Sequence, residues 1–455
     1  MADRFCHGPM RRREFMQVGA LAVGGLSLSD VMAARDASGT SRIETSVIML
    51  YQHGGASQLE TYDLKPDAPS DYQSQFKPIS TNVPGIEICE LFPRQARIAD
   101  RFSLVRSLHH DVSIHSDGGI VVLTGKRPTV LDPNSQSKSE HPDFGSVASK
   151  LRGLGPDAMP PYVAIPRKPY MTQPTYLGLH HGAFEITAPH ADNYQSPHMK
   201  LSAGRDAELL LDRHQLISQL NQLRRDVDLH GTDSMEKFRR LAVEFLTSSR
   251  AAQAFDISLE DESLRDRYGR HLWGQACLLA RRLAEAGTAV VNIYLDTPKS
   301  GDEFTNWDDH PGNAGRPGHF AKYMKTRLPY MDEALSALIE DIFERGLEKQ
   351  IMVVAVGEFG RTPKMRYGAP DRSYGRDHWP QAYTALVSGG GLRMGQVVGA
   401  TNAKAEYPTE KPYTPQDLLA TIYRHLGIDH TQALHDFSGR PVHILSGARP
   451  IQELI

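Results

Sequence analysis

The order of apolar runs along the chain is the feature that most limits its fold. Runs such as TSVIMLYQHGG and QIMVVAVGEFG have the length of buried strands and end at glycines. Helical patterns such as HPDFGSVASKLRG and MDEALSALIEDIFERGL lie between them. Strands that alternate with helices of this length favour βαβ units, so we expect an α/β fold with a mainly parallel sheet. The same reasoning predicts further strands within 96–108, 160–166, 288–296 and 382–391.

The first residues have the features of an export signal. Arg12 and Arg13 precede a weakly apolar, Gly- and Ala-rich run, and Val31-Met32-Ala33 suits a signal peptidase. The run is too short and too glycine-rich for a stable membrane span, and the paired arginines resemble a twin-arginine signal. We therefore expect residues 1–34 to be removed and the mature protein to be periplasmic or extracellular, with no integral membrane segment. The alternative is a basic tail before a short helix.

One domain is expected over residues 44–450, because no long linker and no repeat of fixed period interrupts the pattern. Leu, Arg and Asp recur at helical spacing from about 202 to 286, which predicts a helical insertion there.

Charge and missing motifs exclude several classes of function. The chain has 51 Lys and Arg against 54 Asp and Glu, so nothing in its net charge of -3 favours nucleic acid as a partner. It has no G-x-S-x-G elbow, no P-loop and no dinucleotide fingerprint. Its 20 histidines often stand beside Asp or Gly, which favours metal or acid–base chemistry, with scattered surface histidines as the alternative.

Carboxylates and imidazoles follow three of the expected strands. In open α/β sheets the ligand site gathers at the carboxyl ends of the strands, so these side chains should lie close together. Carboxylate and imidazole are ligands of Zn²⁺ and similar divalent ions. The candidate metal ligands are His53 and Asp63 after the first strand, Asp308 and His310 after a later one, and Glu358, Asp377 and His378 after the next.

Long motifs also carry a family resemblance. QHGGASQLETYDLKPDAP, HSDGGIVVLTGKRP, NWDDH, GEFGRTPK and GRDHWPQAYTALVSGGGLRMGQVVGAT resemble, in order, those of the bacterial domain-of-unknown-function family 1501 over nearly the whole mature chain. That family is similar to a branch of the alkaline phosphatase and sulfatase superfamily. The resemblance implies a doubly wound, mostly parallel sheet flanked by helices, with one or two divalent metals at its end. It also implies cleavage of phosphate or sulfate esters.

The resemblance also assigns roles to residues. Asp308 and His310 match a metal-binding loop, Glu358 the next carboxylate ligand, and Asp377 and His378 the late segment that completes the site. Two positions depart from the superfamily: Phe359 stands where a second ligand usually follows, and His53 stands where Asp is usual. His53 would then replace that carboxylate, or Asp63 would reach in from the following loop. Zinc is the metal expected, with calcium and manganese as alternatives.

Two residues are candidates for the attacking group. HSDGGIVVLTGKRP resembles the segment that places the nucleophile at a helix start, and counting back from Thr124-Gly125 gives His115 or Ser116. A serine at a helix N-terminus beside a metal could accept a phosphoryl group, with metal-bound hydroxide as the alternative attacker. No cysteine is available for conversion to formylglycine. Arg361 or Arg376 would neutralise the leaving oxyanion, although each could instead pin its own loop.

Two functions follow from these expectations. The first is an exported metal-dependent hydrolase of phosphate or sulfate esters, acting on a small-molecule or polysaccharide substrate. The second is a non-catalytic binding or assembly protein of the cell envelope on the same fold.

Overall fold

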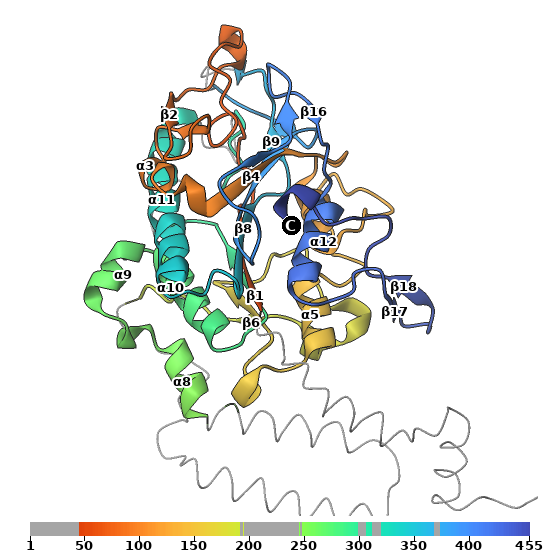
Figure 1. Cartoon of the computed structure of the whole chain (residues 1–455). Helices are drawn as coiled ribbons and strands as arrows, with labels where there is room; N and C mark the ends of the chain where they lie inside the picture. The colour runs from red at the N-terminus through yellow and green to blue at the C-terminus, as the bar shows by residue number, and fades with distance from the viewer. Residues whose placement is uncertain are drawn as a thin grey trace, which may run out of the picture. The chain divides into compact units, whose positions relative to one another are not determined.

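The computed structural model describes residues 45–191, 194, 245, 248–298, 306–311, 320–367 and 374–455. Their centre is an eight-stranded sheet in the order β14-β4-β13-β8-β1-β7-β5-β6 (Figure 1). Its strands are β1 (Ser46–Tyr51), β4 (Phe102–Leu108), β5 (Tyr162–Ile165), β6 (Phe184–Glu185), β7 (Val290–Tyr294), β8 (Ile351–Val356), β13 (Tyr383–Gly389) and β14 (Val397–Val398). β1 is central and runs parallel to both β7 and β8.

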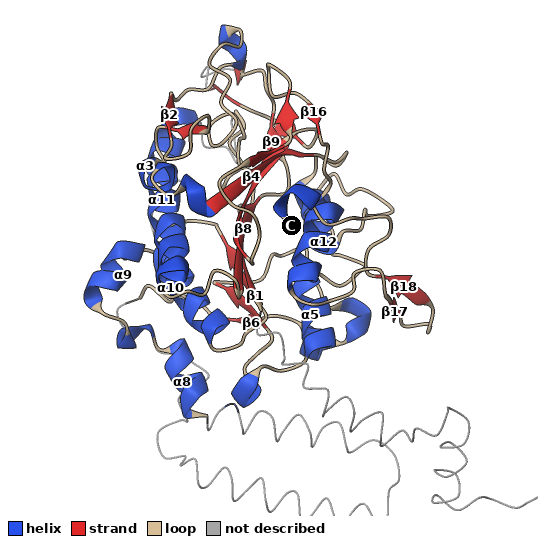
Figure 2. Cartoon of the chain, in the orientation of Figure 1, coloured by secondary structure: helices blue, strands red, loops and turns tan. Residues whose placement is uncertain are grey.

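Helices cover both faces of this sheet, as Figure 2 shows. One face carries α3 (Pro93–Ala96), α10 (Leu272–Glu285) and α11 (Phe320–Glu344), and the other carries α4 (His115–Thr124), α5 (Phe144–Arg152) and α12 (Pro415–His425). Side chains alternate along β1, so Ile48 and Leu50 enter the first core while Val47 and Met49 enter the second. The expectation of a mostly parallel, doubly wound α/β sheet is confirmed.

Smaller elements surround the sheet. Two further helices are α8 (Ser249–Phe255) and α9 (Glu262–Tyr268). The short strand pairs are β2 (Pro78–Ser80) with β3 (Glu87–Cys89), β9 (Gly360–Arg361) with β12 (His378–Trp379), β10 (Arg366–Tyr367) with β11 (Tyr374–Gly375), β15 (Ala400–Thr401) with β16 (Pro408–Glu410), and β17 (Ala433–His435) with β18 (Pro441–His443).

One strand of the large sheet runs against the others. β13 pairs antiparallel with both β8 and β4. A parallel neighbour would need a crossover connection, commonly a helix, and no helix occurs in the described parts of the segment between β8 and β13. Because β13 is reversed, the residues that precede it lie at the same edge as those that follow β1 and β8. His378 reaches this edge by preceding a strand.

The expected signal, residues 1–34, lies outside the described residues, as does most of the expected insertion before residue 248. The later part of that insertion contains α8, α9 and α10, and α10 packs against β1 and β7. Within the described part of the chain, no helix combines the length and apolar character needed to cross a membrane.

The N-cap of α5 gives a pH-dependent prediction. Asp143 accepts a hydrogen bond from Ser146 N at 2.9 Å, and its burial raises the pKa of the carboxyl to about 6. The folded chain therefore binds this proton more tightly than the unfolded chain, and the free energy of unfolding falls as the pH rises from about 4 to about 6. Asp143→Asn keeps a good cap without the buried charge, so we expect it to be more stable than wild type at pH 7, by up to about 3 kcal/mol. Urea unfolding at pH 4 and pH 7 checks this, and a difference that does not change with pH would contradict it.

Candidate functional site

Asp308 lies at the centre of the site, because four side chains converge on its carboxylate. Oδ1 accepts from Arg361 Nη2 at 2.8 Å and lies 3.1 Å from His378 Nε2. Oδ2 lies 3.1 Å from His310 Nε2 and 3.3 Å from His115 Nε2. Burial alone raises the pKa of Asp308, but Arg361, together with His115 and His310, outweighs burial and holds that pKa far below its usual range. Asp308 is therefore an anion to which basic groups are directed.

Glu358, which follows β8, supplies a second carboxylate and is completely buried. Its Oε1 accepts from Gly54 N at 2.7 Å and from His115 Nδ1 at 2.7 Å, and lies 3.5 Å from His53 Nδ1. Burial raises the pKa of Glu358, but His53 and the hydrogen bond from His115 outweigh it and bring the pKa to about 2. Burial lowers the pKa of His115, while its bonds to the two carboxylates raise it to about 9. His115 thus bridges Glu358 and Asp308.

The hydrogen bonds of His378 determine which ring nitrogen is free to act as a ligand. Its Nδ1 lies 2.7 Å from Ser113 O, and a carbonyl oxygen can only accept, so Nδ1 carries the proton. Burial lowers the pKa of His378, which favours the neutral ring. The lone pair of Nε2 then faces the lone pairs of Asp308 Oδ1 at 3.1 Å. Two acceptors that face each other at this distance suit a cation bound between them.

His115, Asp308 and His378 form a group whose ligand atoms lie within 4.8 Å of one another. Two imidazole nitrogens and one carboxylate oxygen match the three protein ligands of catalytic zinc sites. Within the described part of the chain, the buried atoms His53 Nδ1 and Glu358 Oε2 make no hydrogen bond, and His115 Nε2 has only its 3.3 Å contact with Asp308 Oδ2. Buried polar atoms are rarely left unpaired. The residues present therefore fit a divalent cation.

A glycine lets the segment that carries Asp308 approach the end of β1. Gly54 has φ of 108°, and a Cβ built there would lie 2.3 Å from Asp308 N. Trp307 N donates to His53 O at 2.8 Å, so the two segments touch along their main chains. Any other residue at position 54 would need both an unfavourable φ and a displaced Asp308.

Arg361 lies behind Asp308 and is completely buried. Besides its bond to Asp308, Nη2 donates to Gly54 O and to Trp307 O, the latter at 3.0 Å. Nε donates to Gly55 O at 3.0 Å, and Nη1 donates to Arg376 O at 3.1 Å. The guanidinium therefore joins three loops and balances the charge of Asp308. This geometry favours a structural role for Arg361, in which it holds its loop in place, over contact with a leaving group.

Ser116 follows His115 in the first turn of α4, the predicted helix, which ends at Thr124 with Gly125 at φ of 70°. Its Oγ donates to Asp117 Oδ2 at 2.7 Å, and its side chain is buried. Ser116 N donates to Ser135 Oγ at 3.1 Å. Ser116 thus follows one member of the ligand group along the chain, and the Asp117 carboxylate is in place to accept its proton.

Two candidate ligands lie apart from this group. Asp63 accepts from Thr401 Oγ1 and pairs with Lys65 Nζ at 2.9 Å. Asp377 pairs with Arg366 Nη1 at 2.8 Å at the surface. Within the described residues, these two carboxylates are paired with other cations, Asp63 with Lys65 and Arg106 and Asp377 with Arg366.

Asp377→Ala is accordingly expected to leave divalent metal affinity within about twofold of wild type, since exposed ion pairs contribute little and the His378 ring is held elsewhere. Titration calorimetry of the metal-free chain with Zn²⁺ measures it. A loss of tenfold or more would place Asp377 among the ligands.

Sequence reasoning missed several contributions to the site. It considered His115 only as an attacking group, whereas the structure groups it with Asp308 and His378. It also missed His110, whose Nε2 lies 2.6 Å from Glu358 O and whose Nδ1 accepts from Val112 N at 3.1 Å. The paired histidines of LHHD were the available signal. Nothing in the sequence indicated that a main-chain carbonyl, Ser113 O, orients His378.

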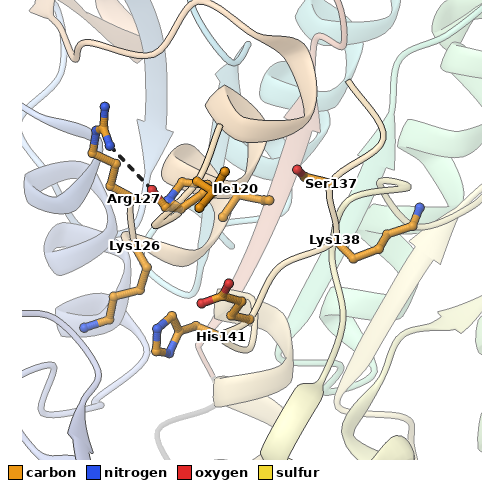
Figure 3. Close-up of a pocket in the computed structure, with 9 residues that line it drawn as sticks. Ile120, Lys126, Arg127, Ser137, Lys138 and His141 are labelled. Atoms are coloured by element: carbon orange, nitrogen blue, oxygen red, sulfur yellow. Dashed lines mark hydrogen bonds between the residues drawn. The ribbon is translucent and has the colours of Figure 1, made fainter. Parts of the chain in front are cut away.

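A separate pocket of about 50 Å³ lies beyond the C-terminal end of α4 (Figure 3). It is lined by Ile120, Lys126, Arg127, Pro128, Val130, Ser137, Lys138, Glu140 and His141. Lys126 Nζ donates to His443 O at 2.7 Å and Lys138 Nζ to Tyr170 O at 2.6 Å. Figure 3 shows these two ammonium groups pointing to opposite sides, away from the pocket. The pocket therefore lacks the convergent cations of an anion site and includes none of the residues around Asp308.

The chain is similar to one protein family and to several solved structures. A family model described as "Protein of unknown function (DUF1501)" matches residues 44–455, and no curated protein matches the chain. The lipoteichoic acid synthase of Listeria monocytogenes is 10% identical, with a TM-score of 0.36 over 89% of this chain and 76% of that one. A sulfatase from Pseudoalteromonas sp. is 14% identical, with a TM-score of 0.38 over 92% and 72%. A phosphonate monoester hydrolase from Silicibacter pomeroyi is 11% identical, with a TM-score of 0.36 over 90% and 76%. Likenesses of this size give no information on the chemistry of this chain.

Proposed function

The chain belongs to the DUF1501 family of proteins of unknown function, as its motifs predicted, and from its geometry we propose that it is an exported metal-dependent hydrolase of phosphate or sulfate esters. One observation supports this most strongly: the ligand atoms of His115, Asp308 and His378 lie within 4.8 Å of one another, and Ser116 directly follows His115 in the first turn of α4. The signal-like pattern of residues 1–34 supports export. Zinc is the metal that this ligand set favours.

In the proposed reaction, the metal ion and the residues of the chain would each supply part of the chemistry. A bound divalent ion would polarise the oxygens of the ester as a Lewis acid. Ser116 Oγ would form the new bond to phosphorus or sulfur while its proton passes to Asp117 Oδ2, 2.7 Å away, and the ester oxygen leaves with its electron pair. Water would then attack the phosphorus or sulfur of the phospho- or sulfo-serine, so that phosphate or sulfate leaves and Ser116 Oγ regains a proton. Direct attack by water is the alternative, and Glu358 in both cases orients His115.

Metal content and an ester panel test this proposal together. Wild type purified after export in its native host is measured by inductively coupled plasma mass spectrometry beside Asp308→Ala/His378→Ala and the exposed-histidine control His435→Ala. We expect stoichiometric metal in wild type and control, none in the double variant, and hydrolysis of at least one phosphate or sulfate ester that follows metal content. Metal-free wild type, or activity that survives in the double variant, would refute the proposal.

The burial of Ser116 favours a second candidate, a binding or assembly protein that keeps the metal group without catalysis. A nucleophile that donates to Asp117 inside the fold must be uncovered before it meets an ester. Ser116→Ala separates the candidates. A serine-based hydrolase loses its turnover, a water-based hydrolase keeps most of it, and a binding protein shows no turnover in wild type while it still binds metal.

A further inference from the structure

Arg376 is a buried cation whose hydrogen bonds are all used within the fold. Arg376 and Glu60 are both completely buried, and Nη2 lies 2.9 Å from Glu60 Oε1. Nε donates to the same carboxylate at 3.0 Å, and Nη2 also donates to Gln73 O at 2.8 Å. Nη1 donates to Thr362 O at 3.0 Å and to Pro363 O. A guanidinium has five N–H groups, so none is left for a substrate.

This ion pair joins the segments that carry the site. Glu60 belongs to the loop after β1, while Arg376 stands two residues before His378. Arg376 N donates to Asp309 O at 3.1 Å, next to Asp308, and Arg361 Nη1 donates to Arg376 O at 3.1 Å. The main chain at Arg376 is thus tied both to the segment of Asp308 and to the guanidinium behind it.

His378 needs such support because its own strand is short. β12 has two residues and pairs with the two residues of β9, with His378 opposite Arg361. A two-residue ladder holds little by itself. The ring of His378 is about one-quarter exposed, so packing restrains it only in part.

We propose that Glu60 and Arg376 are the positioning residues that fix His378 against Asp308. The ion pair fixes the distance between His378 and Asp308 before the cation binds, and thereby raises affinity for the cation. The consequence for metal affinity rests on the proposed function, whereas the placement of His378 does not. Supporting contacts of this kind around metal ligands alter affinity by about 10- to 100-fold when removed.

The first arm of the test measures metal affinity in Glu60→Gln and in a matched control. Glu260→Gln breaks another ion pair, in which Arg281 Nη2 of α10 lies 2.6 Å from Oε1 of Glu260, a largely buried residue just before α9. Zinc calorimetry is expected to show at least tenfold weaker binding for Glu60→Gln and wild-type binding for Glu260→Gln. Where Glu60→Gln does not fold, Arg376→Lys carries the same test, because it keeps the charge and loses the paired hydrogen bonds.

The second arm needs no metal. With ¹⁵N-histidine labelling, the Nδ1 proton of His378 should give a slowly exchanging imidazole signal because it donates to Ser113 O, and the signal is assigned by its loss in His378→Ala. We expect it in metal-free wild type and Glu260→Gln, and expect fast exchange in Glu60→Gln. Its persistence in a folded Glu60→Gln, or its absence from wild type, overturns the positioning role. If the signal behaves as expected while wild type binds no metal, the proposed function fails and the positioning role stands.

Discussion

Replacing Asp308 by asparagine is expected to weaken divalent metal binding by more than about 100-fold, beyond the range seen for supporting partners. The change keeps the size of the side chain and removes its charge. His115, His310 and His378 then lose the anion to which they are directed, and Arg361 loses its ion-pair partner. Zinc calorimetry on the metal-free chain is the measurement, with circular dichroism to show that the variant is folded.

Asp377→Ala is the matched control, since it removes the carboxylate next to His378, which pairs with Arg366 at the surface. If the asparagine variant binds zinc as tightly as this control, the cation does not contact Asp308. The metal group would then have to be sought around Glu358 and His53, whose ring nitrogen and carboxylate oxygen lie 3.5 Å apart.

Arg361→Met is expected to lower the free energy of unfolding by about 3–5 kcal/mol, the cost typical of breaking a buried pair. The variant leaves Asp308 buried without its cation. It also removes the Arg361 donor from the carbonyl groups of Gly54, Gly55 and Arg376. Urea unfolding at neutral pH, with both proteins free of metal, gives the difference.

Arg366→Met provides the comparison, because Arg366 is two-thirds exposed and its pair with Asp377 should contribute at most about 1 kcal/mol. Equal stability of the two variants would show that Arg361 does not hold the loops together. That result would restore the alternative in which Arg361 is kept for contact with a substrate.

Much of the architecture could be predicted from local pattern. Strands β1, β7 and β8 and helix α5 lie where apolar runs and helical spacing placed them, because each is buried along its length or on one face. Strand direction could not be predicted in the same way. β13 has the composition of a buried strand in either direction, and its reversal depends on the connection from β8.

The sequence predicted which segments form the site, but it did not predict which side chains of those segments face one another. Asp377 and His378 are consecutive, yet Asp377 pairs with Arg366 at the surface and only His378 faces Asp308. Asp309, next to Asp308, likewise turns away to pair with Arg327. A motif locates such a pair of neighbours, while the direction of each side chain is set by pairing partners far away in the sequence.

The pairing of β1 also has a consequence for how the chain folds. Val47 pairs with Val290, and Ser46 pairs with Ile351, so both neighbours of the central strand are synthesised long after it. Contacts at such sequence separation slow folding, because the loop between them must close first. We therefore expect the centre of the sheet to form only when almost the whole polypeptide has left the ribosome, with β1 as an apolar segment that chaperones must shield until then.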